Sequence, residues 1–193
     1  KEARTAKDFS AESGVVHVLD YFEENETAYL VMEYLDGISL EQYFREKGQM
    51  DAKTLFQLLW PLMKTLDKIH KRGIIHRDIS ADNIRISTNE NGIFQAELID
   101  FGSARDYIIQ KTHTVEVKNG YAPLEQYSRD GLQGPWTDIY ALCAVIYEGM
   151  TGQRPINAVL RSMQDSLSMP SALGIVYGSG QKKIEKILKN AEV

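Results

Sequence analysis

The stretch that decides the fold is Gly73-Ile74-Ile75-His76-Arg77-Asp78-Ile79-Ser80-Ala81-Asp82-Asn83-Ile84. It places an acid, Asp78, and an amide five positions later, Asn83, in a loop between a helical pattern and a short strand. A second acid follows an apolar run in Leu98-Ile99-Asp100-Phe101-Gly102. Asp78 is suited to accept a proton from an attacking hydroxyl group. Asn83 and Asp100 offer the oxygen ligands that Mg²⁺ prefers.

A base, a metal clamp and positioning are the main protein contributions to phosphoryl transfer. The two motifs, H-R-D-x-x-x-x-N and then D-F-G, resemble those of the eukaryotic-type serine/threonine protein kinase family. The resemblance implies an α+β, protein-kinase-like fold, with a mostly helical large lobe and short β-hairpins. It implies ATP and Mg²⁺ as cofactors and a protein as the substrate. The implied catalytic residues are Asp78, Asn83 and Asp100, and the last two would bind the metal.

The composition of the 193 residues is that of a globular protein, with 43% hydrophobic and 25% charged residues. A net charge of −5 argues against a nucleic-acid partner, since such interfaces are usually basic. Cys143 is the only cysteine, which excludes an intramolecular disulfide and favours a reducing, cytoplasmic location. No apolar run approaches the roughly 20 residues of a membrane span, so we expect no membrane contact from this segment.

Residues 1–9 are predicted to be the end of a helix. In the resemblance, Glu2 matches the glutamate that pairs with the lysine holding the ATP phosphates; the alternative is a solvated helix glutamate. The glycine-rich loop and V-A-I-K strand of the family do not occur in these 193 residues. We therefore expect a chain lacking most of the N-terminal lobe. Residues 1–36 would be a remnant of the small lobe and hinge, and 37–193 the large lobe, cut before its last helix. Such a chain should transfer phosphate slowly on its own.

Two β-branched and aromatic runs, residues 15–22 and 27–34, flank a polar turn and predict an antiparallel hairpin. The resemblance places Met32 at the back of the adenine pocket, although a strand methionine can also be a plain core residue. The backbone of Glu33 and Leu35 would bind the adenine edge, and Ile99 would lie beside ATP. A second hairpin, over residues 84–86 and 96–99, should bring Asn83 and Asp100 together.

Helices are predicted over residues 40–47, after an Ser39 N-cap, and from Asp51 to residue 71, where apolar residues recur every three or four positions. His70 lies on that apolar face and is expected to be a hydrogen-bonded core histidine. A mostly apolar helix is predicted over residues 135–150. In the resemblance its Asp138 ties down the backbone of the His76-Arg77 turn, and Cys143 is a small core residue.

The active site departs from the family pattern at three positions. Ser80 stands where the family has a lysine that reaches the γ-phosphate. Lys118, seven residues before Glu125, stands where threonine is common. Because the two positions face each other in the family's fold, we predict that Lys118 supplies the missing cation. Arg85 replaces an apolar residue beneath adenine, and it could stack on the base, fill the pocket or point to solvent.

Residues 100–125 resemble an activation segment of the bacterial branch, which often has a G-Y-A-P-P-E-Q-Y sequence where this chain has Gly120 to Tyr127. Thr112 or Thr114 is predicted to be phosphorylated and to pair with Arg77; the alternative is an unmodified threonine. The resemblance gives structural or regulatory roles to His76, Arg77, Phe101, Gly102, Thr112, Thr114, Glu125 and Asp138.

Two other functions compete with that of a serine/threonine protein kinase. A pseudokinase or scaffold would bind partners without catalysis, but Asp78, Asn83 and Asp100 argue against this alternative. A small-molecule phosphotransferase of similar fold generally lacks a segment like Tyr121 to Glu125.

Overall fold

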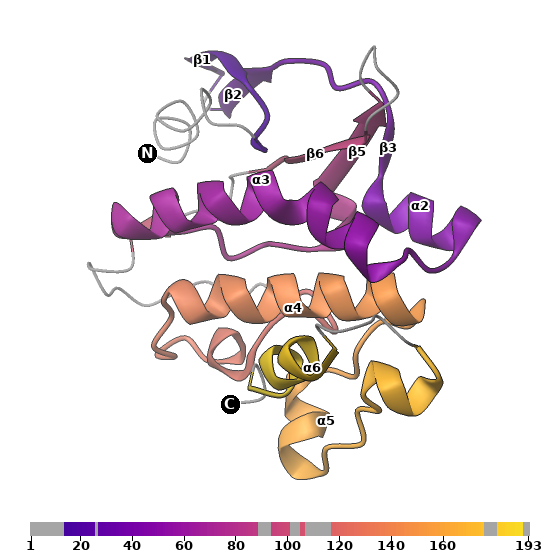
Figure 1. The fold of residues 1–193 in the computed structure, drawn as a ribbon. Helices are drawn as coiled ribbons and strands as arrows, with labels where there is room; N and C mark the ends of the chain where they lie inside the picture. Colours follow the sequence, from indigo (N-terminus) through magenta and orange to yellow (C-terminus); the bar gives the residue numbers. More distant parts are fainter. Residues whose placement is uncertain are drawn as a thin grey trace.

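The computed structural model describes residues 14–25, 27–88, 94–100, 105–106, 117–175 and 181–190. The chain begins with the antiparallel hairpin of β1 (Val18–Glu24) and β2 (Thr27–Met32), in which Tyr21 pairs with Leu30. This confirms the first predicted hairpin, with its strands starting and ending a few residues from the predicted runs. The hairpin lies at the top of Figure 1, above the helices.

A second, three-stranded sheet has the order β3-β5-β6. It consists of β3 (Ile38–Ser39), β5 (Ile84–Thr88) and β6 (Phe94–Leu98), and Ile84 pairs with Leu98 in the antiparallel β5–β6 hairpin. The predicted second hairpin is therefore confirmed. β4 (Ile74–Ile75) pairs with β7 (Arg105–Asp106), which brings the chain beyond Asp100 beside the loop that contains Asp78.

α2 (Leu40–Lys47) and α3 (Ala52–Lys71) begin and end where the sequence predicts. α2 is capped by the Ser39 hydroxyl, which accepts a hydrogen bond from the Gln42 N–H at 3.1 Å. α3 is capped by Asp51, whose carboxylate accepts from the Thr54 N–H at 3.0 Å. These side chains satisfy backbone donors that have no partner within the helix.

α4 (Pro135–Thr151) is the central helix, and from Tyr140 to Thr151 every side chain is buried. α3 and α4 lie side by side, with α5 (Ala158–Met163), η3 (Pro170–Leu173) and α6 (Gln181–Asn190) on the other side of α4 (Figure 1). One core joins the second sheet to these helices, and its largest fully buried members include Leu40, Leu55, Leu59, Leu62, Leu66, Ile69 and Ile84. Burial of this apolar surface is the main force that stabilises the fold.

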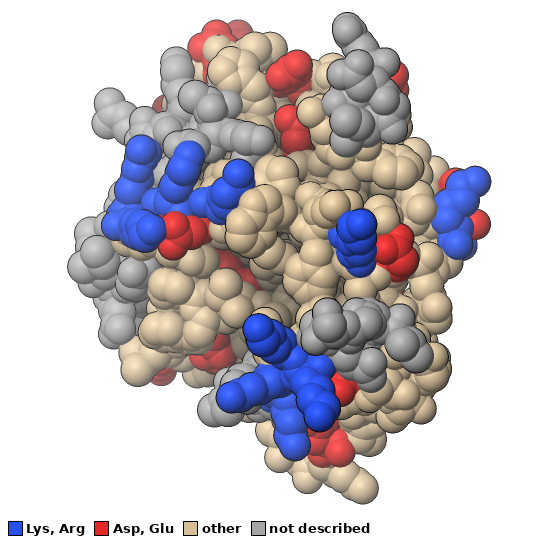
Figure 2. Space-filling model, in the orientation of Figure 1, with Lys and Arg blue, Asp and Glu red and all other residues tan. Residues whose placement is uncertain are grey.

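Charge is unevenly distributed over the surface. On the face in Figure 2, basic side chains gather near the C-terminal end of α3 and over α6, which carries Lys182, Lys183, Lys186 and Lys189. Among the helices of the described residues, none is both long and apolar enough to cross a bilayer.

Five predicted site residues lie outside the described residues: Glu2, Phe101, Gly102, Thr112 and Thr114. The predicted helix end at residues 1–9 lies outside them as well.

Candidate active site

A tight turn at His76 and Arg77 is fixed by a buried carboxylate. Asp138, in the first turn of α4, has no exposed side-chain surface, and its Oδ2 and Oδ1 atoms accept hydrogen bonds from the N–H groups of His76 and Arg77, both at 2.8 Å. His70 of α3 places Nε2 2.7 Å from the same Oδ2 atom. Arg77 has a φ of 73°, a left-handed conformation that a non-glycine residue adopts only where its surroundings impose it. The predicted anchoring of the His76-Arg77 turn by Asp138 is confirmed, and His70 is hydrogen-bonded, as expected, to a partner that was not predicted.

His76 orients the next part of this loop. The imidazole is fully buried, and its Nδ1 accepts a hydrogen bond from the Asp78 N–H at 3.3 Å. Burial lowers the pKa of His76, although the charges of Asp138, Asp78 and Asp100 oppose the shift. A neutral imidazole matches the acceptor role of Nδ1.

Asn83 holds the carboxylate of Asp78 from one side. It belongs to η1 (Ala81–Asn83), and its Nδ2 donates to the backbone oxygen of Asp78 at 2.9 Å and to Asp78 Oδ2 at 2.8 Å. The Ile99 N–H donates to the Asn83 carbonyl at 2.9 Å, so the β5–β6 hairpin brings Asp100 next to Asn83.

This arrangement fits a magnesium ion. Because the amide nitrogen of Asn83 faces Asp78, the amide oxygen is the atom of Asn83 that would bind a cation. The exposed Asp100 would supply a carboxylate oxygen. One or two protein oxygens, with phosphate oxygens and water, are what Mg²⁺ uses in phosphoryl-transfer sites.

Lys118 approaches Asp78 from the other side. Its Nζ lies 3.4 Å from Asp78 Oδ1, 2.9 Å from the Oγ of the buried Ser80 and 2.8 Å from Asp82 Oδ2. The predicted proximity of Lys118 to Asp78 and Ser80 is confirmed. Asp82 is a contact that the sequence reasoning missed, because nothing in the sequence distinguishes it from an ordinary loop acid. Burial would raise the pKa of Asp82, but hydrogen bonds from Lys118 and Ser80 and the charge of Lys118 lower it.

The backbone around Lys118 is held in place. Its carbonyl accepts hydrogen bonds from the N–H groups of Tyr121 and Ala122, both at 3.0 Å. The hydroxyl of the buried Tyr121 donates to Glu148 of α4, and the guanidinium of Arg154 lies 4.9 Å from the centre of the Tyr121 ring. Burial is the first cause that raises the pKa of Tyr121, so the phenol stays protonated and keeps donating.

Glu125 lies farther along the same segment, in η2 (Leu124–Tyr127). Its Oε1 accepts a hydrogen bond from the Thr137 hydroxyl at 2.7 Å, and this bond joins the segment to the start of α4. The backbone from Lys118 to Glu125 is thus tied to α4 at two places.

Three residues predicted to lie at the adenine pocket, Met32, Glu33 and Leu35, lie at the end of β2 and in the connection from β2 to β3. Met32 ends β2 with 38% of its surface exposed, so it is not a core residue. The Glu33 N–H donates to the His17 carbonyl at 2.8 Å. The edge of the adenine ring would therefore form hydrogen bonds with the Glu33 carbonyl and the Leu35 N–H.

Arg85 makes backbone contacts that were not among the three alternatives predicted from the sequence. Ile84 and Ile86 are buried and Arg85 is on the opposite face of β5, as strand alternation predicts. Its Nη2 donates to the carbonyls of Leu35, at 3.3 Å, and Gly37. The guanidinium therefore ties the connection between β2 and β3 to β5.

Gly37 allows this close approach. Its φ is 130°, and a Cβ atom there would lie 2.1 Å from the carbonyl oxygen of Ile86. Only glycine fits without moving the backbone.

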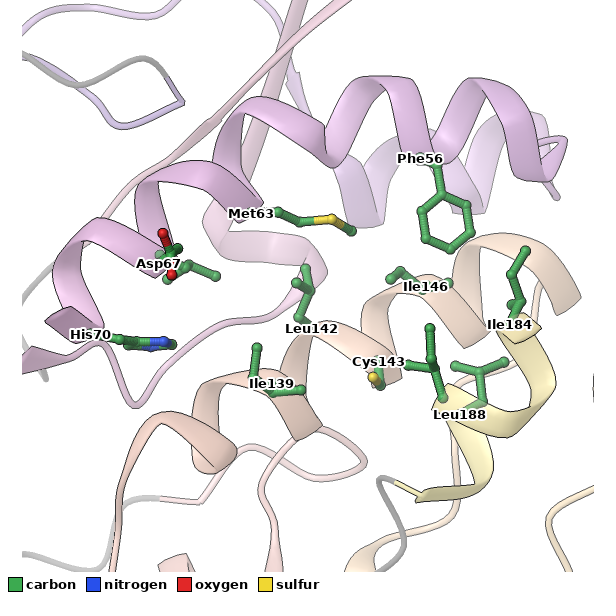
Figure 3. Close-up of a pocket in the computed structure, with 12 residues that line it drawn as sticks. Phe56, Met63, Asp67, His70, Ile139, Leu142, Cys143, Ile146, Ile184 and Leu188 are labelled. Carbon is green, nitrogen blue, oxygen red and sulfur yellow. The ribbon is translucent and has the colours of Figure 1, made fainter. Parts of the chain in front are cut away.

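A cavity of about 310 Å³ lies between α3, α4 and α6, and its lining contains none of the predicted site residues (Figure 3). Its walls are mostly apolar, and the thiol of Cys143 faces it. Burial raises the pKa of Cys143 to about 11, so the thiol stays protonated, in agreement with the prediction of a core cysteine.

Comparisons with known proteins agree with this geometry. A family model described as the protein kinase domain matches residues 1–186. The chain is 32% identical over 155 residues to the probable serine/threonine-protein kinase zyg-1 of Caenorhabditis elegans, covering 80% of the chain and 22% of that protein. It is 34% identical over 160 residues to the probable serine/threonine-protein kinase CPE1738 of Clostridium perfringens, covering 81% and 22%. For the serine/threonine-protein kinase PrkC of Bacillus subtilis the identity is 31% over 160 residues, covering 81% and 24%. The chain thus spans less than a quarter of the length of these relatives.

Proposed function

Because this chain belongs to the protein kinase family, we propose that it is most of the catalytic region of a serine/threonine protein kinase. The reaction is transfer of the γ-phosphate of ATP to hydroxyl groups of a protein substrate. In this proposal residues 1–36 are the end of the small lobe and the hinge, and residues 37–193 belong to the large lobe. The chain on its own is expected to transfer phosphate slowly. Its lone, buried Cys143 favours a reducing location such as the cytoplasm.

The observation that carries the proposal is the position of the Asp78 carboxylate between an amide and an ammonium group. Asn83 donates to one carboxylate oxygen at 2.8 Å, and Lys118 lies 3.4 Å from the other. Both oxygens are oriented before a substrate binds. The Asp78 carboxylate can then position a hydroxyl group and accept its proton as the new bond to phosphorus forms.

The remaining groups act on the phosphates and the base. A magnesium ion held by Asn83 and Asp100 would neutralise charge on the phosphate oxygens. The Lys118 ammonium adds positive charge on the side of the site opposite Asn83, in place of the lysine that Ser80 replaces. Met32, Glu33, Leu35, Arg85 and Ile99 are assigned to the nucleotide pocket in this proposal.

The test is the replacement of Asp78 by asparagine in the purified protein that contains this chain. Loss of a general base is expected to lower kcat by about 10²–10⁴-fold. Phosphate transfer from labelled ATP to a protein acceptor measures the rate, and calorimetric titration with Mg-ATP checks that the nucleotide still binds. Asp130→Asn, which changes an exposed carboxylate, serves as the control with unchanged kcat. An Asp78→Asn protein with the same kcat as the parent would refute the assignment.

Regulation through Arg77 gives another prediction. We propose that Thr112 or Thr114 is phosphorylated in the active protein and that the phosphate pairs with Arg77. A phosphate brings about −1.5 to −2 charges, and the Arg77 guanidinium already donates from Nε to Gln133 Oε1 at 2.6 Å. Mass spectrometry of the active protein should find the modification, and changing both threonines to alanine should reduce activity. Full activity of that double variant would count against the idea.

A further inference from the structure

The tip of Lys118 is shared between two carboxylates. Its ammonium lies 2.8 Å from Asp82 and 3.4 Å from Asp78, with the hydroxyl of Ser80 at 2.9 Å as a third contact. We propose that Asp82 is a positioning residue that holds the Lys118 ammonium beside Asp78 without letting it close onto Asp78. This inference rests on the proposed function, in which Lys118 supplies a cation to the transferred phosphate.

One short turn, η1, orients both of the side chains that flank the Asp78 carboxylate. Asp82 and Asn83 are neighbours in η1, yet Asn83 binds Asp78 while Asp82 binds Lys118. Asn83 is buried, whereas the side chains of Asp82 and Lys118 are 39% and 32% exposed. The ion pair therefore lies at the open side of the site, where a phosphate can reach the ammonium.

The backbone alone does not fix this ammonium. The turn from Lys118 to Ala122 and the Tyr121–Glu148 hydrogen bond hold the Lys118 main chain. A lysine charge sits at the end of a flexible four-carbon stem, so its place is set by the acceptors around the tip. Ser80 is neutral. Without the Asp82 charge, the stronger remaining attraction would come from Asp78.

Movement of the ammonium onto Asp78 would harm the reaction in two ways. An ion pair closer than the present 3.4 Å contact would make the Asp78 carboxylate a weaker proton acceptor. It would also take the cation away from the phosphate oxygens that it should stabilise. The pair is too exposed to matter much for folding, because ion pairs in contact with solvent contribute little to stability.

The test compares Asp82→Asn with Asp82→Glu and Lys118→Ala in the purified protein that contains this chain. Asp82→Asn should lower kcat about tenfold, less than the 10²–10³-fold expected for loss of a whole donor. The KM for ATP should change less than about twofold, since the contacts with the adenine base do not change. Asp82→Glu should recover most of the rate. In the Lys118→Ala background, Asp82→Asn should have no further effect, because both changes act through one group.

A matched control exists on α3. Asp67 pairs with Lys71 at 2.6 Å, and this ion pair is also exposed to solvent. Asp67 lies beside the cavity and not at the active site (Figure 3). Asp67→Asn should leave kcat unchanged. In nucleotide-free protein, mass spectrometry can measure the rate at which an amine-reactive reagent acylates Lys118. This rate should change several-fold in Asp82→Asn and stay constant in Asp67→Asn.

The outcomes separate this inference from the proposed function. An Asp82→Asn protein with unchanged or higher kcat, or one whose loss persists without Lys118, would overturn the role of Asp82. Unchanged acylation of Lys118 would overturn it as well. If Lys118→Ala itself leaves kcat unchanged, the proposed role of Lys118 fails, and the inference about Asp82 fails with it.

Discussion

Replacement of Lys118 by alanine is expected to lower kcat by about 10²–10³-fold, as is typical when one preorganised donor to a developing charge is removed. The reason is that Ser80 carries no charge, so the variant would have no lysine at either position. The measurement is kcat for phosphate transfer in the purified protein that contains this chain. The KM for ATP should change much less, because the ammonium acts mainly on charge that develops in the transition state.

A second change tests whether position or mere charge is responsible. Adding Ser80→Lys to the Lys118→Ala protein should restore part of the lost rate, since the two side chains meet at 2.9 Å in the parent. Lys53→Ala is a suitable control, because Lys53 is an exposed lysine of α3. An unchanged kcat in the Lys118→Ala protein would end the proposal.

Asp138→Ala is expected to lower the free energy of unfolding by about 3–5 kcal/mol. The change leaves the N–H groups of His76 and Arg77 buried or half-buried without their acceptor, and each such group costs about 1–3 kcal/mol. It also removes the carboxylate that contacts the part-buried His70 at 2.7 Å. Urea unfolding followed by circular dichroism measures the difference.

Asp138→Asn provides the graded comparison. An asparagine keeps one acceptor oxygen, so it should destabilise less than alanine and still lower activity by releasing the left-handed Arg77 backbone. Asp36→Ala, at an exposed acid, should leave the unfolding free energy within about 0.5 kcal/mol of the parent. If Asp138→Ala were equally mild, the buried carboxylate would not be what holds the turn.

The elements that could be predicted from the sequence are those with a local physical cause. Ser39 and Asp51 cap the helices that follow them, and apolar spacing marks α3 because one face of a helix recurs every three or four residues. β3, β4 and β7 were missed, since a strand of two residues is too short for alternation to appear. The pairings of such strands depend on neighbours that are distant in the sequence.

Some contacts of the candidate site could likewise be predicted and others could not. The resemblance to a known family gave the proximity of Asp78, Asn83 and Lys118 and the anchoring role of Asp138. It gave no indication of Asp82, whose partner Lys118 arrives from a separate segment of the chain. It also left the role of Arg85 open, because its acceptors are backbone carbonyls and these look the same at every residue. Contacts of this kind appear only once the chain is folded.

The contact of Gly37 with β5 has a mechanical consequence. A side chain at this position would collide with Ile86, and the next residue, Ile38, pairs with Ile86 in the three-stranded sheet, so the chain after Gly37 is held closely against β5. The other end of the β1–β2 hairpin is attached to the same sheet, because the Val16 N–H donates to the Leu98 carbonyl at 3.1 Å and the Leu98 N–H donates to the Gly14 carbonyl at 2.9 Å. Hydrogen bonds also restrain Glu33 and Leu35, so Tyr34, whose side chain is 85% exposed, lies between two anchored residues in the connection that follows β2.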